Sequence, residues 1–194
     1  MDPLPPKNTF INLSLFKVAP EFRGRSAFIV QLWWIIQDCL IRTSPQFMYG
    51  WRRFWWRVFG AEIGDHVIIR PTAKVTYPWK IKVGDYSWIG DNVELYSLGP
   101  IEIGSDVVIS QYAYLCAGTH DYTKLDFPLV AKPIRVEDQA WIAAGCFIAP
   151  GVIIGMGSII GAHSVVLDDM PAATICAGNP ARAVKPRPVP KSSI

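Results

Sequence analysis

A six-residue pattern recurs along the chain from Ile63 to Pro171. Each copy holds an aliphatic residue, then glycine or another small residue, then polar residues typical of turns. Six residues are too few for a strand and a crossover helix, but they suffice for one short strand and one tight turn. Three such units would close a triangular coil, and stacked coils would bury their aliphatic side chains in a continuous apolar prism. The copies are Ile63-Gly-Asp-His-Val-Ile, Val83-Gly-Asp-Tyr-Ser-Trp, Ile89-Gly-Asp-Asn-Val-Glu, Ile103-Gly-Ser-Asp-Val-Val, Ile154-Gly-Met-Gly-Ser-Ile and Ile160-Gly-Ala-His-Ser-Val.

The spacing of the copies predicts the architecture. Ile63, Val83 and Ile103 are 20 residues apart, one coil of 18 residues with two extra, and Val136 and Ile154 are 18 residues apart. One copy alone would mean nothing, but copies in phase over this length are highly specific. We therefore predict an all-β repeat fold, a parallel β-helix over residues 61–171. An N-terminal appendage (residues 1–60) precedes it and a C-terminal tail (residues 172–194) follows it.

One long interruption falls between His120 and Val136. The segment 121–133 has no place in the wall, so we expect it to project outward, where binding chemistry is often placed on a rigid scaffold. His120 stands at the break. A lone histidine at a turn is usually a surface residue, but an imidazole with an ordinary pKa of about 6.5 is also suited to act as a general base at neutral pH.

The N-terminal 60 residues do not follow the repeat. Residues 1–24 are rich in proline and polar residues, and we expect an extended arm. Residues 25–42 contain neither glycine nor proline and predict a helix that Ser26 caps, too short for an ordinary membrane span. Residues 50–60 mix Trp and Phe with Arg at helical spacing. This Trp-rich appendage could cap the open end of the prism, pack between subunits, or contact a membrane peripherally through residues 25–59.

Composition excludes several classes of protein. A net charge of +3 and the absence of a nucleic-acid-binding signature argue against a nucleic-acid partner. The four cysteines form no Cys-x-x-Cys pair, which favours reduced, buried thiols, and no secretory leader is evident, so we expect a cytoplasmic protein. The three histidines fall at different offsets within their coils, so we expect no metal site.

Six motifs resemble the maltose and galactoside acetyltransferase family of hexapeptide acyltransferases, and most closely the acetyltransferases assigned to colanic acid biosynthesis. The repeat and the tail that carry the resemblance cover residues 63–185. The motifs are Ala117-Gly-Thr-His-Asp-Tyr122, Lys132-Pro-Ile134, Trp141-Ile-Ala-Ala-Gly145, Ala149-Pro-Gly-Val152, Ile160-Gly-Ala162 and Ala177-Gly-Asn-Pro-Ala-Arg182.

The resemblance implies a left-handed β-helix, an exception to the usual right-handed crossover, and a homotrimer with active sites between subunits. It also implies acetyl-CoA as donor, a sugar or a lipid-linked oligosaccharide as acceptor, and a place in exopolysaccharide synthesis. His120 matches the catalytic histidine, which would deprotonate the acceptor for direct attack on the thioester. Trp141 and Asp121 are expected on the acceptor side. The cofactor-contacting positions fall on Ala144, Ala162, Pro180, Arg182 and Lys185.

Some positions depart from the family. Leu167 and Asp168 stand where relatives often carry Thr and Lys, so one phosphate contact is expected to be missing. The sugar-binding Asn and Asp of galactoside acetyltransferases align with Gly90 and Leu98, which argues against galactoside or maltose as acceptor. An amine acceptor, on an amino sugar or a drug-like molecule, and a non-catalytic trimeric scaffold remain as alternatives.

Overall fold

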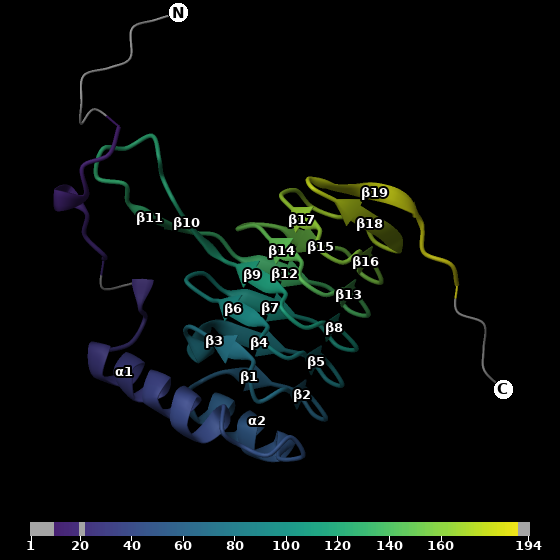
Figure 1. Cartoon of the computed structure of the whole chain (residues 1–194), viewed down its shortest axis with the longest axis horizontal. Helices are drawn as coiled ribbons and strands as arrows, with labels where there is room; N and C mark the ends of the chain where they lie inside the picture. The colour runs from purple at the N-terminus through teal and green to yellow at the C-terminus, as the bar shows by residue number, and fades with distance from the viewer. Residues whose placement is uncertain (1–9, 20–21, 190–194) are drawn as a thin grey trace, which may run out of the picture.

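A computed structural model describes residues 10–19 and 22–189, and it is a three-sided left-handed parallel β-helix with two helices across its N-terminal end (Figure 1). The parts of the predicted arm and tail at 1–9, 20–21 and 190–194 lie outside the described residues. Sheet A holds β1 (Glu62–Ile63), β4 (Ile81–Val83), β7 (Ile101–Ile103), β12 (Ile134–Val136) and β15 (Ile153–Ile154). Sheet B holds β2 (Ile68–Ile69), β5 (Trp88–Ile89), β8 (Val108–Ile109), β13 (Trp141–Ile142), β16 (Ile159–Ile160), β18 (Thr174–Gly178) and β19 (Ala181–Pro186). Sheet C holds β3 (Lys74–Val75), β6 (Glu94–Tyr96), β9 (Tyr114–Cys116), β14 (Phe147–Ile148) and β17 (Val165–Val166).

The predicted coil starts stack directly upon one another. In sheet A, Ile63 pairs with Val83 and Val83 with Ile103. The ladder continues from Ile103 through Val136 to Ile154. All five side chains are buried, so the phase predicted from sequence is confirmed and the aliphatic residue of each repeat builds the core. Sheet B continues past Pro171, because β18 pairs in parallel with β16 and then folds back as β19.

The small second residue of the repeat is required by the close stacking of the coils. A Cβ placed on Gly84 would lie 2.6 Å from the backbone of Gly104 and Ser105, and one on Gly155 would lie 2.5 Å from Ala172 N. The left-handed turn position, by contrast, is often not glycine: His66, Tyr86 and Asp106 occupy it with φ between 56° and 59°.

The corner between sheets C and A, called here the C–A corner, carries the extra residues of the long coils. The first coil adds a short 3-10 turn, Pro78–Lys80, and the third adds the hairpin of β10 (Gly118–His120) and β11 (Leu129–Ala131). Figure 1 shows this hairpin projecting away from the prism. The predicted interruption is thus an antiparallel hairpin that begins at Gly118.

Two helices close the N-terminal end of the prism. Helix α1 (Ala27–Ile36) begins at Ser26, whose side chain accepts a hydrogen bond from Ile29 N, and runs on into a π-helical segment, η3 (Gln37–Ile41). Helix α2 (Tyr49–Val58) follows. Trp33 and Trp56 are fully buried against the first coil and join the core of the prism. Within the described residues, none of the helices has the length and apolar character of a membrane span.

Side chains of these helices donate hydrogen bonds to backbone carbonyls of the first coil. In the later coils, the equivalent carbonyls accept from the N–H groups of the preceding coil. Arg57 donates to Ile63 O in sheet A. Arg52 donates to Ile69 O in sheet B, and Trp33 Nε1 donates to Val75 O in sheet C at 2.9 Å. Because unpaired strand edges are costly when buried and prone to association when exposed, this cap explains why Trp and Arg are concentrated in residues 33–57.

The N-terminal arm runs along the C–A corner from the cap to the hairpin. Its carbonyls at Phe22 and Arg23 accept hydrogen bonds from Lys80 and Trp79. Further along, Asn12 N donates to Leu125 O of the hairpin loop at 2.7 Å. A short 3-10 turn, Leu13–Leu15, interrupts the arm. The arm therefore reaches the same corner that carries His120.

Candidate active site

His120 lies at the loop end of the two hairpin strands, where two aromatic rings and one hydrogen bond contact its imidazole. It pairs with Leu129 across the two strands. The ring of Phe127 stacks on it with centroids 4.2 Å apart and planes 10° apart, and the ring of Phe16, from the arm, approaches with centroids 5.8 Å apart. The half-buried imidazole is therefore fixed in orientation.

The hydrogen bond to the imidazole defines its tautomer. Nδ1 lies 2.8 Å from Phe127 O. A carbonyl oxygen can only accept, so Nδ1 carries the proton and a neutral ring presents the lone pair of Nε2. This is the arrangement that a general base requires, since the second nitrogen is left to take a proton from a substrate.

Asp121, expected on the acceptor side, is engaged within its own loop. Its carboxylate accepts hydrogen bonds from the backbone N and side chain of Thr123 and lies 3.6 Å from Lys124 Nζ. The hydrogen bonds from Thr123 hold the pKa of the Asp121 carboxyl below its ordinary value. The carboxylate shapes the turn that follows His120.

The predicted donor-side residues gather at the far end of the prism. Ala144 and Ala162 occupy the corner between sheets B and C, the B–C corner, in successive coils, where His163 N donates to Ala144 O at 2.8 Å. Pro180 lies in the turn between β18 and β19, and Arg182 and Lys185 lie on β19. All but Ala144 are exposed. A surface of small side chains beside two cations suits an extended ligand that carries phosphates.

Arg182 has an anionic neighbour. Its Nη1 lies 3.3 Å from Asp168 Oδ2, and both side chains are more than 60% exposed. Asp168, which departs from the family pattern, thus forms an ion pair with Arg182, which is expected to bind a phosphate.

Trp141 lies on the outer face of sheet B and donates from Nε1 to Ser110 Oγ at 3.0 Å. Beside it is a pocket of about 450 Å³. It contains an exposed aromatic side chain, Trp88, and the ion pair between Arg70 and Asp91, whose Nε and Oδ2 are 2.8 Å apart. The pocket is lined by Tyr49, Ile68, Arg70, Trp88, Ile89, Gly90, Asp91, Val108, Ile109, Ser110 and Gln111.

The two positions aligned with sugar-binding residues differ in location. Gly90 lines this pocket, whereas Leu98 is buried beneath the hairpin, where a Cβ on Gly118 would lie 2.6 Å from it. Polar side chains for an acceptor are available instead on neighbouring residues, Arg70 and Asp91, which the alignment alone did not indicate. Phe16 and Phe127 were also missed, because no periodicity links the arm or the loop to His120.

The chain does not bring its own predicted residues together. His120 is at the C–A corner, and Ala144 and Ala162 are at the B–C corner, so the width of sheet C separates them. The other histidines lie elsewhere: His66 is between sheets A and B and His163 is at the B–C corner.

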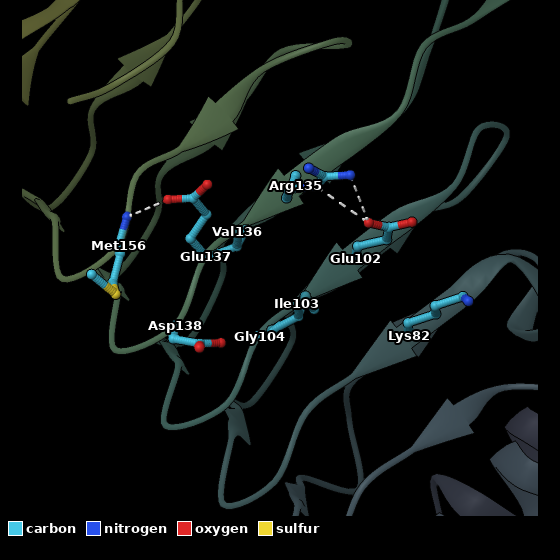
Figure 2. Close-up of a pocket in the computed structure, with 9 residues that line it drawn as sticks. All are labelled: Lys82, Glu102, Ile103, Gly104, Arg135, Val136, Glu137, Asp138 and Met156. Carbon is cyan, nitrogen blue, oxygen red and sulfur yellow. Dashed lines mark hydrogen bonds and ion pairs between the residues drawn. The ribbon is translucent and has the colours of Figure 1, made fainter. Parts of the chain in front are cut away.

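A second pocket, of about 520 Å³, lies on the outer face of sheet A, and none of the predicted site residues lines it (Figure 2). Each of its charged side chains already has a partner within the protein. Arg135 Nη2 lies 3.3 Å from Glu102 Oε2, and Glu137 accepts a hydrogen bond from Met156 N. With these groups paired, we assign no chemistry to this pocket.

Comparison with known proteins finds one family match and several close relatives. Residues 133–168 match the family described as bacterial transferase hexapeptide (six repeats). A protein of Escherichia coli (strain K12), named "Putative colanic acid biosynthesis acetyltransferase WcaF", is 49% identical over 176 residues, which are 91% of this chain and 97% of that protein.

Solved structures share the fold. A hexapeptide-repeat acetyltransferase of Vibrio cholerae O1 biovar eltor, complexed with acetyl-CoA, superposes with a TM-score of 0.76 at 26% identity, over 86% of this chain and 92% of that one. A galactoside acetyltransferase in complex with coenzyme A gives a TM-score of 0.73 at 24% identity, over 87% and 82% of the two chains.

Proposed function

The chain belongs to the hexapeptide-repeat acetyltransferases, and from this premise we propose that it transfers acetyl from acetyl-CoA to a sugar hydroxyl, with His120 as general base. The observation that carries the proposal is the bond between His120 Nδ1 and Phe127 O, which leaves Nε2 free to accept a proton. The family membership makes the protein an acyltransferase and sets aside the non-catalytic scaffold.

The proposed reaction needs no covalent intermediate on the protein. His120 Nε2 takes the proton of the acceptor hydroxyl while the hydroxyl oxygen attacks the thioester carbonyl. The same nitrogen then returns the proton to the departing thiolate, so atoms and charge balance. The stacked ring of Phe127 holds the imidazole in position during both transfers.

We propose that the donor lies along the B–C corner. Ala144 and Ala162 would let a pantetheine arm approach the wall closely, and Arg182 and Lys185 would meet phosphate oxygens. Since that corner is separated from His120 by sheet C, a neighbouring subunit must supply one half of each site. A closed ring of three subunits meets this need, because each copy offers its histidine to one neighbour and its donor corner to the other.

The acceptor is proposed to be a saccharide bound on sheet B near Trp141. Exposed Trp88 offers a flat apolar surface for a sugar ring, while Arg70 and Asp91 offer hydrogen bonds to hydroxyls. The name of the Escherichia coli relative supports a polysaccharide of the colanic acid type, whose repeat units are a chemically reasonable acceptor, free or lipid-linked.

The test is thiol release from acetyl-CoA, measured for the purified chain and for His120→Ala with nucleotide sugars, simple glycosides, amino sugars and lipid-linked oligosaccharides. We expect turnover to fall by about 10² to 10⁴ in the variant. Coenzyme A binding, measured by calorimetry, should be retained. His66→Asn is the control, because it removes a histidine at another corner from a left-handed position that Asn tolerates.

Two outcomes would contradict the proposal. If His120→Ala turned over as fast as the wild-type protein, His120 would not be the general base. Turnover with amines but with no hydroxyl acceptor would change the reaction to N-acetylation at the same histidine.

A further inference from the structure

Helix α1 and its continuation η3 are apolar on two opposite faces. Towards the prism they present Val30, Trp33 and Ile41, which are at most 3% exposed. On the opposite side, Phe28, Leu32 and Ile35 follow one another at helical spacing and are 73%, 36% and 59% exposed. A helix that is apolar all round is normally covered on both sides, yet only one side is covered here.

Helix α2 repeats this arrangement. Arg52 and Trp56 are fully buried against the first coil. Phe54 and Val58, two residues further along in each case and therefore about 200° around the helix, are 53% and 56% exposed. Together, Phe28, Leu32, Ile35, Phe54 and Val58 form what we call the outer cap face.

The outer cap face points away from the prism. Trp33 and Gln37, on the inner side of the same helical segment, bind the O and N of Val75 in the first coil. The outer side therefore faces along the axis of the prism, beyond its N-terminal end, where Figure 1 shows no other element of the coils. Subunits packed side by side, with the axes of their prisms parallel, would leave this face uncovered.

The charge near the outer cap face favours one of two possible partners, a second copy of the chain or a membrane surface. Residues 25–58 contain five arginines and one acidic residue, Asp38. Arg25 lies one turn before Phe28, and Arg42 directly follows η3; both are exposed. A second copy meeting this face end to end would bring arginines against arginines. An anionic bilayer surface would instead accept the apolar side chains and pair its headgroups with the arginines.

We propose that the outer cap face docks on the surface of an anionic lipid bilayer, with the axis of the prism standing away from it. This inference goes beyond the acetyl transfer and is independent of the identity of the acceptor and of His120. The docking is peripheral, since only side chains on the outer surface of the two helices enter the interface. Arg52, Arg53 and Arg57 add positive charge from behind, although their guanidinium groups bind carbonyls of the first coil.

The experiment is cosedimentation of the full chain with vesicles of phosphatidylcholine and phosphatidylglycerol, and with vesicles of phosphatidylcholine alone. We expect binding to the mixed vesicles that weakens as salt rises, and much weaker binding to the neutral ones. The double variant Phe28→Ser and Ile35→Ser should bind at least about tenfold more weakly. Arg25→Gln and Arg42→Gln should each weaken binding about fivefold.

Tyr112→Asn is the matched control, because it removes an aromatic side chain that is 66% exposed on the prism, far from the cap. The thermal unfolding of every variant is measured, so that a misfolded protein is recognised. Wild-type protein that stays in the supernatant with anionic vesicles would overturn the proposal, as would equal binding by the double variant. An assembly whose mass halves in the double variant without lipid would also overturn it, in favour of a second copy on this face.

Discussion

The imidazole of His120 contacts two aromatic residues, Phe16 and Phe127, that lie far apart in sequence. Phe127 supplies a stacked ring and the carbonyl that binds Nδ1, while Phe16 covers the ring from the arm. Since catalysis depends on holding a base within a narrow range of orientation, we propose that the arm contributes to the active site, although its residues 10–19 and 22–24 make no polar contact with the histidine.

Phe16→Ala tests the contribution of the arm. The Nδ1 bond remains in this variant, but the imidazole loses its contact with the Phe16 ring and can tilt. We expect kcat to fall about threefold to tenfold with the KM for acetyl-CoA unchanged, because the donor corner lies elsewhere. Steady-state kinetics measure both. Leu13→Ala, at a side chain that is 66% exposed, should leave kcat unchanged; an equal fall in both variants would mean that only the anchoring of the arm matters.

We expect Asp168 to limit the affinity for the donor through its ion pair with Arg182. An exposed ion pair contributes about 0 to 1 kcal/mol, so a carboxylate 3.3 Å from the guanidinium competes weakly with a phosphate. In Asp168→Asn we expect coenzyme A to bind up to about fivefold more tightly at low salt, and the gain to shrink as salt rises. Calorimetry in two salt concentrations measures this. Unchanged affinity at low salt would place the phosphates away from Arg182.

Among the elements, the helical cap is the one most directly required by the architecture. A β-helix ends in strand edges, and α1 and α2 cover the first coil with apolar rings and bind its carbonyls. Arg52 is fully buried, and burial lowers the pKa of its guanidinium. It donates to the carbonyls of Pro45, Gln46 and Ile69, so one side chain joins the cap to the wall.

Arg52→Met keeps much of the buried volume but leaves these carbonyls without their donor. We expect a loss of about 3 kcal/mol, equivalent to a fall in Tm of roughly 10 °C. Differential scanning calorimetry measures it. Arg135→Met, which removes an arginine from an exposed pair with Glu102, should change Tm little. A fall in Tm for Arg52→Met as small as that for Arg135→Met would show that the carbonyls bound by Arg52 find other donors.

The sequence predicts the coils well because each repeat contains the residues that determine its own structure. These are an inward aliphatic residue and a small residue where coils touch. Strand β18 was not foreseen because a cysteine, Cys176, stands where the repeat has its inward aliphatic residue, although the strand still pairs with β16. The roles of Arg52 and Phe16 follow from contacts between distant segments, and an arginine is ordinarily expected to be exposed. The expectation of buried thiols was wrong for Cys39, which is exposed on the cap.

At the scale of the whole molecule, the prism places the two halves of the proposed site at different corners. The same separation is repeated in every copy, so we propose that a base from one subunit meets a donor corner from the next in an assembly. A heterologous contact of this kind closes into a ring when three copies are related by rotation. The positions of these residues on a single chain therefore support the proposal of a shared site, and the resemblance adds the expectation of three copies.

Mixed assemblies test this directly. His120→Ala removes the base, and Ala162→Trp fills the exposed donor corner; each variant alone should be inactive. If a site is shared between neighbours, random trimers of the two variants contain sites with an intact histidine from one chain and an intact corner from the other. Every trimer that contains both variants has one such site out of three, so we expect the purified mixed species to show about one third of wild-type activity. Co-expression with different tags, purification of the mixed species and thiol-release assays measure it.

Mixing His120→Ala with His120→Gln is the control and should restore no activity. Mixed trimers of the first pair that are no more active than the parents would place the complete site within one chain, and the two corners would then have to communicate through a rearrangement of the hairpin.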